Sequence, residues 1–259
     1  MAAAADVRPS PLRAGLIWTL VRTDFKARYH GTATGFAWAL LKPIAIFLVL
    51  LTVFSFLFTD PRYKLNLMIG LFLWDFFAES TKTGLASLHA KGFILTKVRA
   101  PLPVIVITSL ANPLLTLLVF CVAIAGVLTF SGYTPSLSGL MLFVAYCAAM
   151  FLTCVGFSLA SSVLFLRYRD LNQVWDVVAQ AGFFVAPIVY PLGIVPERFH
   201  FYFYLWPPTP IIEFSRAVLV AGKAPTMTAH IYLAVEVLVV LGMGWAIFRR
   251  FSPRAAEYV

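Results

Sequence analysis

Long apolar stretches alternate with short polar ones along almost the whole chain. The apolar stretches lie at about 35–58, 66–88, 102–130, 136–166, 172–191 and 229–249. A helix needs about 20 mostly apolar residues to cross the ~30 Å hydrocarbon core of a bilayer. Each stretch reaches that length, and the two longest leave room for tilt or for an extension beyond the bilayer. The pattern predicts an all-α integral membrane protein with six transmembrane helices in a single domain, residues 1–259.

Two further segments have a different pattern. Between residues 13 and 29, apolar side chains recur at helical spacing on one side, with Arg22 and Lys26 across from them. This pattern predicts an amphipathic helix that lies along the membrane surface. The segment 195–225 is aromatic and is interrupted by Pro207, Pro208 and Pro210, and its apolar runs are too short to cross. We expect a re-entrant helical hairpin there, shielded by protein.

The composition agrees with a membrane protein. The chain is 61% hydrophobic and 12% charged, with a mean hydropathy of +0.89 and a net charge of +9. So few charged residues are atypical of a soluble domain. Residues 1–11 lack an apolar core before a cleavage site, so we expect the first span to stay as an anchor. Cys121, Cys147 and Cys154 lie in apolar stretches, and their spacing indicates packing rather than metal binding or a disulfide.

The distribution of lysine and arginine predicts the orientation. With the N-terminus inside, the inner segments hold Arg8, Arg13, Arg22, Lys26, Arg28, Lys91, Lys97, Arg99, Arg167, Arg169, Arg249, Arg250 and Arg254. The outer segments hold only Arg62, Lys64, Arg198, Arg216 and Lys223. Because cytoplasmic loops carry an excess of such cations, we expect both termini in the cytoplasm and the hairpin at the outer face.

Two inner segments have more than one interpretation. The basic helix at 13–29 suits an anchor on anionic lipid headgroups, and it suits equally an interface for a cytoplasmic partner. The connector after the second span, where we expect a short cytoplasmic helix, places Phe93, Ile94 and Leu95 between cations. That exposed apolar cluster suits a docking surface or an amphipathic turn that rests on lipid.

Ionisable residues inside apolar stretches are costly and therefore informative. Asp75, Glu79 and Lys82 share one helical face of the second span. Three pairs have the spacing of helical ion pairs: Glu79 with Lys82, Asp24 with Arg28, and Glu213 with Arg216. Structural pairing and a role in gating or cargo contact both remain open for these residues.

Three segments carry a more specific pattern. They are LVRTDFKARYHGTATGFAWALLKPI at 20–44, LRYRDLNQVWDVVAQAGFFVAPIVYP at 166–191 and WPPTPIIEFSRAVLVAG at 206–222. They resemble the permease subunits of type-2 ABC exporters for polysaccharides and polyol phosphates, and the resemblance covers about residues 13–250. The family usually has asparagine where this chain has Lys42, before Pro43. The Lys42 ammonium group either snorkels to the interface or meets an anionic pyrophosphate lipid.

The resemblance implies an assembly and a cargo. It implies a homodimer of this chain with two copies of a cytoplasmic ABC ATPase in the bacterial inner membrane, in contact with lipid and not with nucleic acid. The cargo is an undecaprenyl- or polyprenyl-pyrophosphate-linked glycan, with O-antigen first and capsule, galactan and teichoic acid as alternatives. An integral membrane enzyme acting on lipid-linked sugars is a further alternative. No G-x-x-x-x-G-K-[ST] string occurs, so we expect ATP and magnesium in the ATPase subunit and no cofactor in this chain.

The resemblance also implies roles for two groups of residues. The ATPase-coupling residues are Arg22, Asp24, Lys26, Arg28, Lys91, Phe93, Ile94, Leu95, Arg169 and Asp170. The outer gate comprises Tyr202, Tyr204, Trp206, Pro208, Glu213 and Arg216.

Aromatic side chains on the first and fifth spans are the candidates for contact with the glycan. On the first span, Phe36, Phe47, Phe54 and Phe58 fall within about 40° of one helical stripe, and Trp38 lies near its start. On the fifth span, Trp175, Phe183 and Tyr190 form a looser stripe. Such stripes suit helix packing, and they also suit a lining on which sugar rings slide, by analogy with bases on aromatic platforms.

Overall fold

The structure is a computed structural model that describes residues 12–29, 35–92 and 101–253, and every regular element in these ranges is a helix. The apolar stretches form α2 (Ala37–Phe54), α3 (Tyr63–Ala90), α5 (Leu102–Ser109), α6 (Ala111–Phe130), α7 (Leu137–Arg167), α8 (Leu171–Val185) and α11 (Met227–Phe251). The remaining elements are α1 (Leu12–Tyr29), η1 (Leu192–Ile194), α9 (Glu197–Tyr204) and α10 (Pro208–Leu219). The all-α fold class is confirmed.

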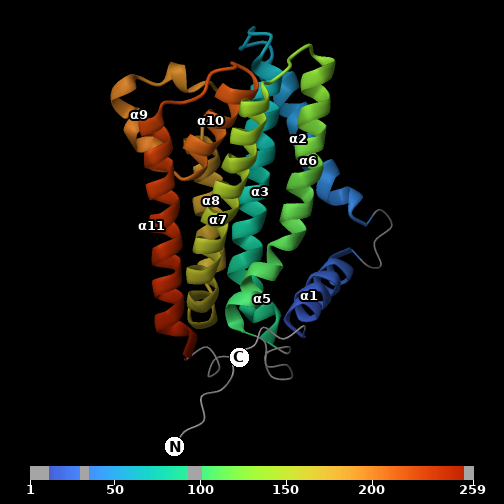
Figure 1. Cartoon of the computed structure of the whole chain (residues 1–259), viewed down its shortest axis with the longest axis vertical. Coiled ribbons are helices and arrows are strands. Elements are labelled where there is room, and N and C mark those ends of the chain that lie inside the picture. The colour runs from blue at the N-terminus through green and yellow to red at the C-terminus, as the bar shows by residue number, and fades with distance from the viewer. Residues whose placement is uncertain (1–11, 30–34, 93–100, 254–259) are drawn as a thin grey trace, which may run out of the picture.

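Helices α3 and α7 form the centre of the bundle (Figure 1). α3 contacts α2, α5, α6, α7, α8 and α10, and α7 also contacts α11. Leu65, Leu67, Ile69 and Leu73 on α3 are fully buried. A helix that is surrounded by other helices buries apolar residues on all its sides. The N-terminal half of α3 therefore lies in the core of the bundle.

Helices α7 and α11 approach each other through glycines. A β-carbon on Gly244 would lie 2.0 Å from the carbonyl oxygen of Gly156, and a β-carbon on Gly156 would lie 2.8 Å from Cα of Leu241. Small residues let helix backbones come close in a membrane, where van der Waals contact replaces the hydrophobic effect as the main attraction between helices. The last helix is therefore attached to α7 by close backbone packing around Gly156 and Gly244.

Within the described residues, four segments have a length and composition that suit a membrane span: Ala37–Phe54, Leu102–Phe130, Leu137–Arg167 and Met227–Phe251. They correspond to the first, third, fourth and sixth predicted spans. α3 has 28 residues, but Asp75, Glu79 and Lys82 interrupt its apolar character. The six-span topology stays a prediction.

The fifth predicted span, 172–191, is wrong as a single helix. α8 has 15 residues and ends at Val185, so it is about 22 Å long, less than the hydrocarbon core. The residue before a proline is displaced from helical backbone angles, and Ala186, before Pro187, has φ −69° and ψ 124°. Residues 186–191 continue as turns toward η1.

The third predicted span is interrupted near its start. α5 ends at Ser109 and α6 begins at Ala111, with Leu110 between them at φ −80° and ψ −5°. Pro113 lacks the N–H that would bond the carbonyl of Ser109, and its ring crowds that carbonyl. The interruption thus lies where proline predicts it.

Different helices form the two ends of the bundle. α1 and the C-terminal end of α11 lie at one end, with α5, whereas α9 lies at the other end and α10 packs near it (Figure 1). The segment 195–225 forms two short helices separated at Leu205–Pro207, as the prolines predict. α1 packs on α5 and α6 and buries Leu20, while Ile17 and Trp18 on the same helix are exposed.

Candidate functional site

A groove of about 680 Å³ runs between α2, α3 and α8. α3 provides one wall, with Leu71, Trp74, Asp75, Ala78, Glu79 and Lys82, and these positions recur at spacings of three and four residues. They therefore form one helix face. α8 provides Trp175, Asp176, Ala179, Gln180, Phe183 and Phe184, and α2 provides Lys42, Pro43 and Ile46.

A smaller cavity of about 220 Å³ adjoins the groove on the side of α1. The two share Lys42, Pro43, Asp75 and Glu79, and the smaller cavity extends to Arg28, Tyr29 and Trp38. Charged side chains at the depth of apolar helices are expensive unless they pair or face water. The two cavities therefore adjoin at a place lined by the ionisable side chains of Lys42, Asp75 and Glu79.

Ion pairs connect α1, α3 and α8, which are three of the helices that border the two cavities. Lys82 Nζ lies 2.7 Å from Asp176 Oδ1 and joins α3 to α8. Arg28 of α1 pairs with Glu79 of α3, and Asp24 of α1 pairs with Lys91, the residue that follows α3. The pairing predicted within single helices is wrong for Glu79 with Lys82 and for Asp24 with Arg28. Helix packing brings opposite charges from neighbouring helices closer than the charges within one helix.

An aromatic cluster closes the groove on the side of α10. Trp175 packs on Phe157 with ring centroids 4.0 Å apart, and its indole Nε1 donates to Thr81 Oγ1 at 3.1 Å. Trp206 contacts Trp74, Phe77 and Trp175 with centroids between 5.8 and 6.4 Å. Phe183 meets Trp74 at 5.9 Å. The predicted lining residues Trp175 and Phe183 therefore border the groove, and Trp206 of the predicted gate packs behind them.

The aromatic stripe of α2 lies elsewhere. Phe47, Phe54 and Phe58 are partly buried against the core, with Phe47 6.2 Å from Phe72 and Phe58 5.0 Å from Tyr63 between ring centroids. Phe36 packs on Phe25 and Tyr29. These rings face α3 or α1 within one subunit and do not line the groove. Helix packing accounts for the stripe, and its contact with a glycan stays a prediction.

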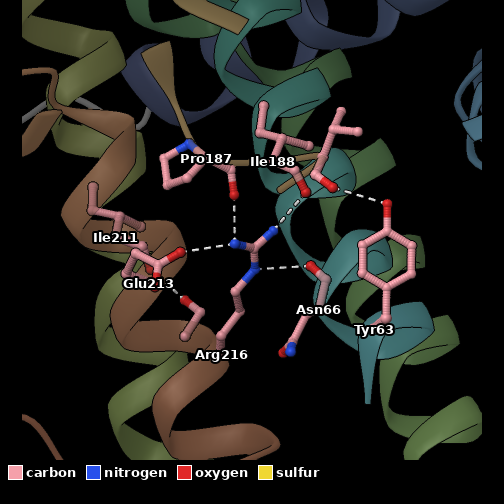
Figure 2. Close-up of polar contacts among 9 residues, drawn as sticks. Tyr63, Asn66, Pro187, Ile188, Ile211, Glu213 and Arg216 are labelled. Atoms are coloured by element: carbon pink, nitrogen blue, oxygen red, sulfur yellow. Dashed lines mark hydrogen bonds and ion pairs between the residues drawn. The ribbon is translucent and has the colours of Figure 1, made fainter. Parts of the chain in front are cut away.

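A buried arginine joins three chain segments at the end of the bundle opposite α1 (Figure 2). Arg216 on α10 is 8% exposed. Its Nε donates to the carbonyl of Asn66 at 2.9 Å, Nη1 to that of Pro187 at 2.6 Å, and Nη2 to that of Ile188 at 2.9 Å. Nη1 also contacts Glu213 Oε1 at 2.8 Å, which confirms the predicted i,i+3 pair. Burial lowers the pKa of Arg216 and the Glu213 carboxylate opposes that shift, so the pair keeps the guanidinium charged.

The other predicted gate residues differ in exposure. Tyr202 is exposed, Tyr204 and Trp206 are partly buried, and Pro208 is buried. Tyr204 packs on Phe214 with centroids 6.3 Å apart. A β-carbon on Gly182 of α8 would lie 2.4 Å from Cζ2 of Trp206. Only glycine at this position therefore leaves room for the indole ring. The hairpin is thus attached to α8 through Trp206 and to α3 through Arg216.

The predicted ATPase-coupling residues gather at the end with α1. Arg22 and Lys26 are exposed, and Arg169 Nη1 lies 2.6 Å from His89 Nδ1, between the α7–α8 turn and the end of α3. Asp170 precedes α8 without a capping hydrogen bond from its side chain. Phe93, Ile94 and Leu95 lie outside the described residues.

Several groove residues were absent from the predicted lining set. Trp74, Asp75, Gln180 and Phe184 all border the groove. The cost of an acid within an apolar span was a usable signal for Asp75. Tyr190, which was predicted to line the channel, borders a separate pocket near Arg216 instead.

A bundle of membrane-length apolar helices with an internal charged groove is the architecture of a multi-pass membrane transport protein. The chain belongs to the ABC-2 type transporter family, whose model matches residues 15–220. Members of this family are membrane subunits of transporters, so the prediction of a permease rather than an enzyme is confirmed.

Three relatives align over most of the chain. The O-antigen export system permease protein RfbA of Klebsiella pneumoniae is 27% identical over 245 residues, covering 93% of this chain and 94% of the relative. RfbA of Myxococcus xanthus is 26% identical over 253 residues, covering 94% of each. The polysialic acid transport protein KpsM of Escherichia coli is 24% identical over 232 residues, covering 87% and 89%.

Proposed function

We propose that the chain is the channel-forming subunit of an ATP-driven exporter that moves a lipid-linked polysaccharide, of O-antigen type, out of the cytoplasm. The relatives named for O-antigen export and polysialic acid transport favour a polysaccharide cargo. The observation that carries the proposal is the groove between α2, α3 and α8, with its aromatic walls and paired charges.

The chemistry of the groove suits a sugar polymer. Trp74, Trp175 and Phe183 offer aromatic surface, while Gln180 and the Lys82–Asp176 pair offer hydrogen-bonding groups. The positive and negative charges of these ion pairs largely cancel. No single charge therefore holds a long glycan in place as it passes through the groove. Polar groups at membrane depth are tolerated where they line a water-filled cavity, which a hydrated glycan needs.

The proposed assembly follows the resemblance and the family. Two copies of this chain bind two copies of a cytoplasmic ABC ATPase in the bacterial inner membrane, and ATP and magnesium bind in the ATPase. Both termini lie in the cytoplasm, and the cargo is linked to a polyprenyl pyrophosphate. α3 crosses the membrane in the centre of the bundle, and α8 crosses together with residues 186–191, which makes six crossings.

A groove-blocking substitution tests the proposal. Gln180→Trp places an indole in the groove, whereas Val177→Trp places one on the exposed face of the same helix, where Val177 is 67% exposed. Each variant is expressed in cells that lack the wild-type chain. We expect Gln180→Trp to abolish surface glycan and to accumulate lipid-linked glycan inside, while Val177→Trp exports normally. Normal export in cells without the chain, or equal export by both variants, contradicts the proposal.

A further inference from the structure

A second cavity of about 640 Å³ opens at the end of the bundle opposite α1. Its walls are the α2–α3 turn, the start of α3, residues 188–193 and one side of α10. We propose that this outer pocket binds neutral sugar units of the exported glycan after they leave the groove. This proposal rests on the proposed function for the identity of the cargo, and on the pocket's own residues for the class of ligand.

Hydrogen bonds fix the residues at the base of this pocket. Arg216 borders it and is bonded to carbonyl groups from α3 and from residues 187–188, and to Glu213 on its own helix (Figure 2). The Tyr63 hydroxyl donates to the carbonyl of Val189 at 2.9 Å. These bonds fix three chain segments around the cavity. A pocket that is formed before the ligand arrives loses less entropy on binding.

The charges around the pocket cancel. Asp60 pairs with Arg62 at 3.5 Å, and Glu213 pairs with Arg216 at 2.8 Å. Two acids and two arginines leave no net charge in this lining, and Arg216 directs four of its five N–H donors to three carbonyl groups and Glu213. An anion such as phosphate is favoured by net positive charge, which this lining lacks. The charge balance therefore favours a neutral ligand.

The aromatic rings favour a sugar among neutral ligands. Phe58, Tyr63 and Tyr190 border the pocket, and the hydroxyls of Tyr63 and Tyr190 already donate to the carbonyls of Val189 and Phe184. Phe58 and Tyr190 are partly exposed and offer apolar surface beside the carboxylates, whereas Tyr63 is buried. A sugar ring presents both C–H faces and hydroxyls, and it matches a cavity that combines apolar surface with a few placed polar groups.

The outer pocket lies next to the groove along α3. Tyr63, Asn66 and Leu67 border the pocket, and the groove begins at Leu71. Leu67 and Leu71 are four positions apart, about 6 Å along the helix axis. Between them, the Arg216 guanidinium lies against Gly70, where a β-carbon would be 2.4 Å from Nη2. The two cavities therefore lie one turn of α3 apart, and a sugar unit that moves from the groove to the pocket passes Arg216.

Protection of a cysteine tests the proposal. In a chain whose three cysteines are replaced by alanine, Gly193→Cys adds a thiol at the pocket, and Glu197→Cys adds one on α9 outside it. No atom lies within 4 Å of a β-carbon at Gly193, so this change fits. The full chain in lipid nanodiscs is labelled with a membrane-impermeant maleimide in the presence of maltotriose or inorganic phosphate.

We expect maltotriose at ten times its Kd to slow labelling at position 193 about tenfold, as simple occupancy predicts. Labelling at position 197, and labelling in phosphate, should not change. Adding Tyr190→Leu should abolish the protection, while Tyr202→Leu, which alters an exposed tyrosine outside the pocket, should leave it intact. Protection by phosphate alone, equal effects at both positions, or no effect of maltotriose overturns the proposal.

Export in cells separates this proposal from the proposed function. Glycan export that requires the chain, combined with no protection by maltotriose, overturns only the outer pocket. Protection by maltotriose in a chain whose removal leaves glycan export unchanged overturns the proposed function and leaves a sugar site of another purpose.

Discussion

Replacing Gly244 by alanine tests the close packing of α7 and α11. The new methyl group would lie 2.0 Å from the carbonyl oxygen of Gly156 and 2.6 Å from its carbonyl carbon. Both are backbone atoms, so no side-chain rotation relieves the contact. Gly242, two residues earlier on α11, is a matched control because a β-carbon there meets no atom within 4 Å.

The magnitude follows from the geometry. Ordinary contact begins at 3.4 Å, so the two helices must separate locally by up to about 1.4 Å and lose attraction along the seam. Overpacking of this kind destabilises a protein by about 1–3 kcal/mol. The contact with backbone atoms, which cannot rotate away, places the expected cost near the upper end of that range. Replacing glycine by alanine within a helix also stabilises the helix by about 1 kcal/mol, which offsets part of this cost. We expect Gly244→Ala to destabilise by about 2 kcal/mol, and Gly242→Ala to be neutral or slightly stabilising.

Thermal unfolding of the purified chain in one detergent measures the difference. About 2 kcal/mol corresponds to a midpoint lower by roughly 4–8 °C for a chain of this size. Because neither Gly156 nor Gly244 borders the groove or the outer pocket, export per folded molecule should be retained. Equal midpoints for the two variants would refute the close approach of α7 and α11.

Three further predictions concern the sites. Arg216→Ala leaves Glu213 without its partner and removes the bonds to three carbonyls, so it should cost about 3–5 kcal/mol, read as loss of folded protein in detergent. Lys82→Asp should impair export with a stability change below about 1 kcal/mol, because that pair is half exposed, and adding Asp176→Lys should restore export. Phe47→Ala should lower thermal stability by about 3 kcal/mol while export per folded complex is unchanged; lost export at normal stability would instead favour a lining role.

The membrane helices could be predicted from the sequence because their signal is local. The apolar runs at 102–130 and 136–166 are long enough for a bilayer, and the structure has helices there within a residue or two. Proline accounts for the irregularities: Pro113 marks the break before α6, and Pro187 marks the end of α8. The Glu213–Arg216 pair was predictable for the same reason, since both residues lie on one short helix.

The tertiary structure decided which helices share their charges and which faces they turn to one another. Glu79 pairs with Arg28 rather than with Lys82, because α1 packs on α5 and α6 and so brings Arg28 next to α3. The stripe of Phe47, Phe54 and Phe58 has helical periodicity, but periodicity does not say whether a face meets the core or a channel. The groove exists only where α2, α3 and α8 come together, and its lining combines residues more than a hundred positions apart.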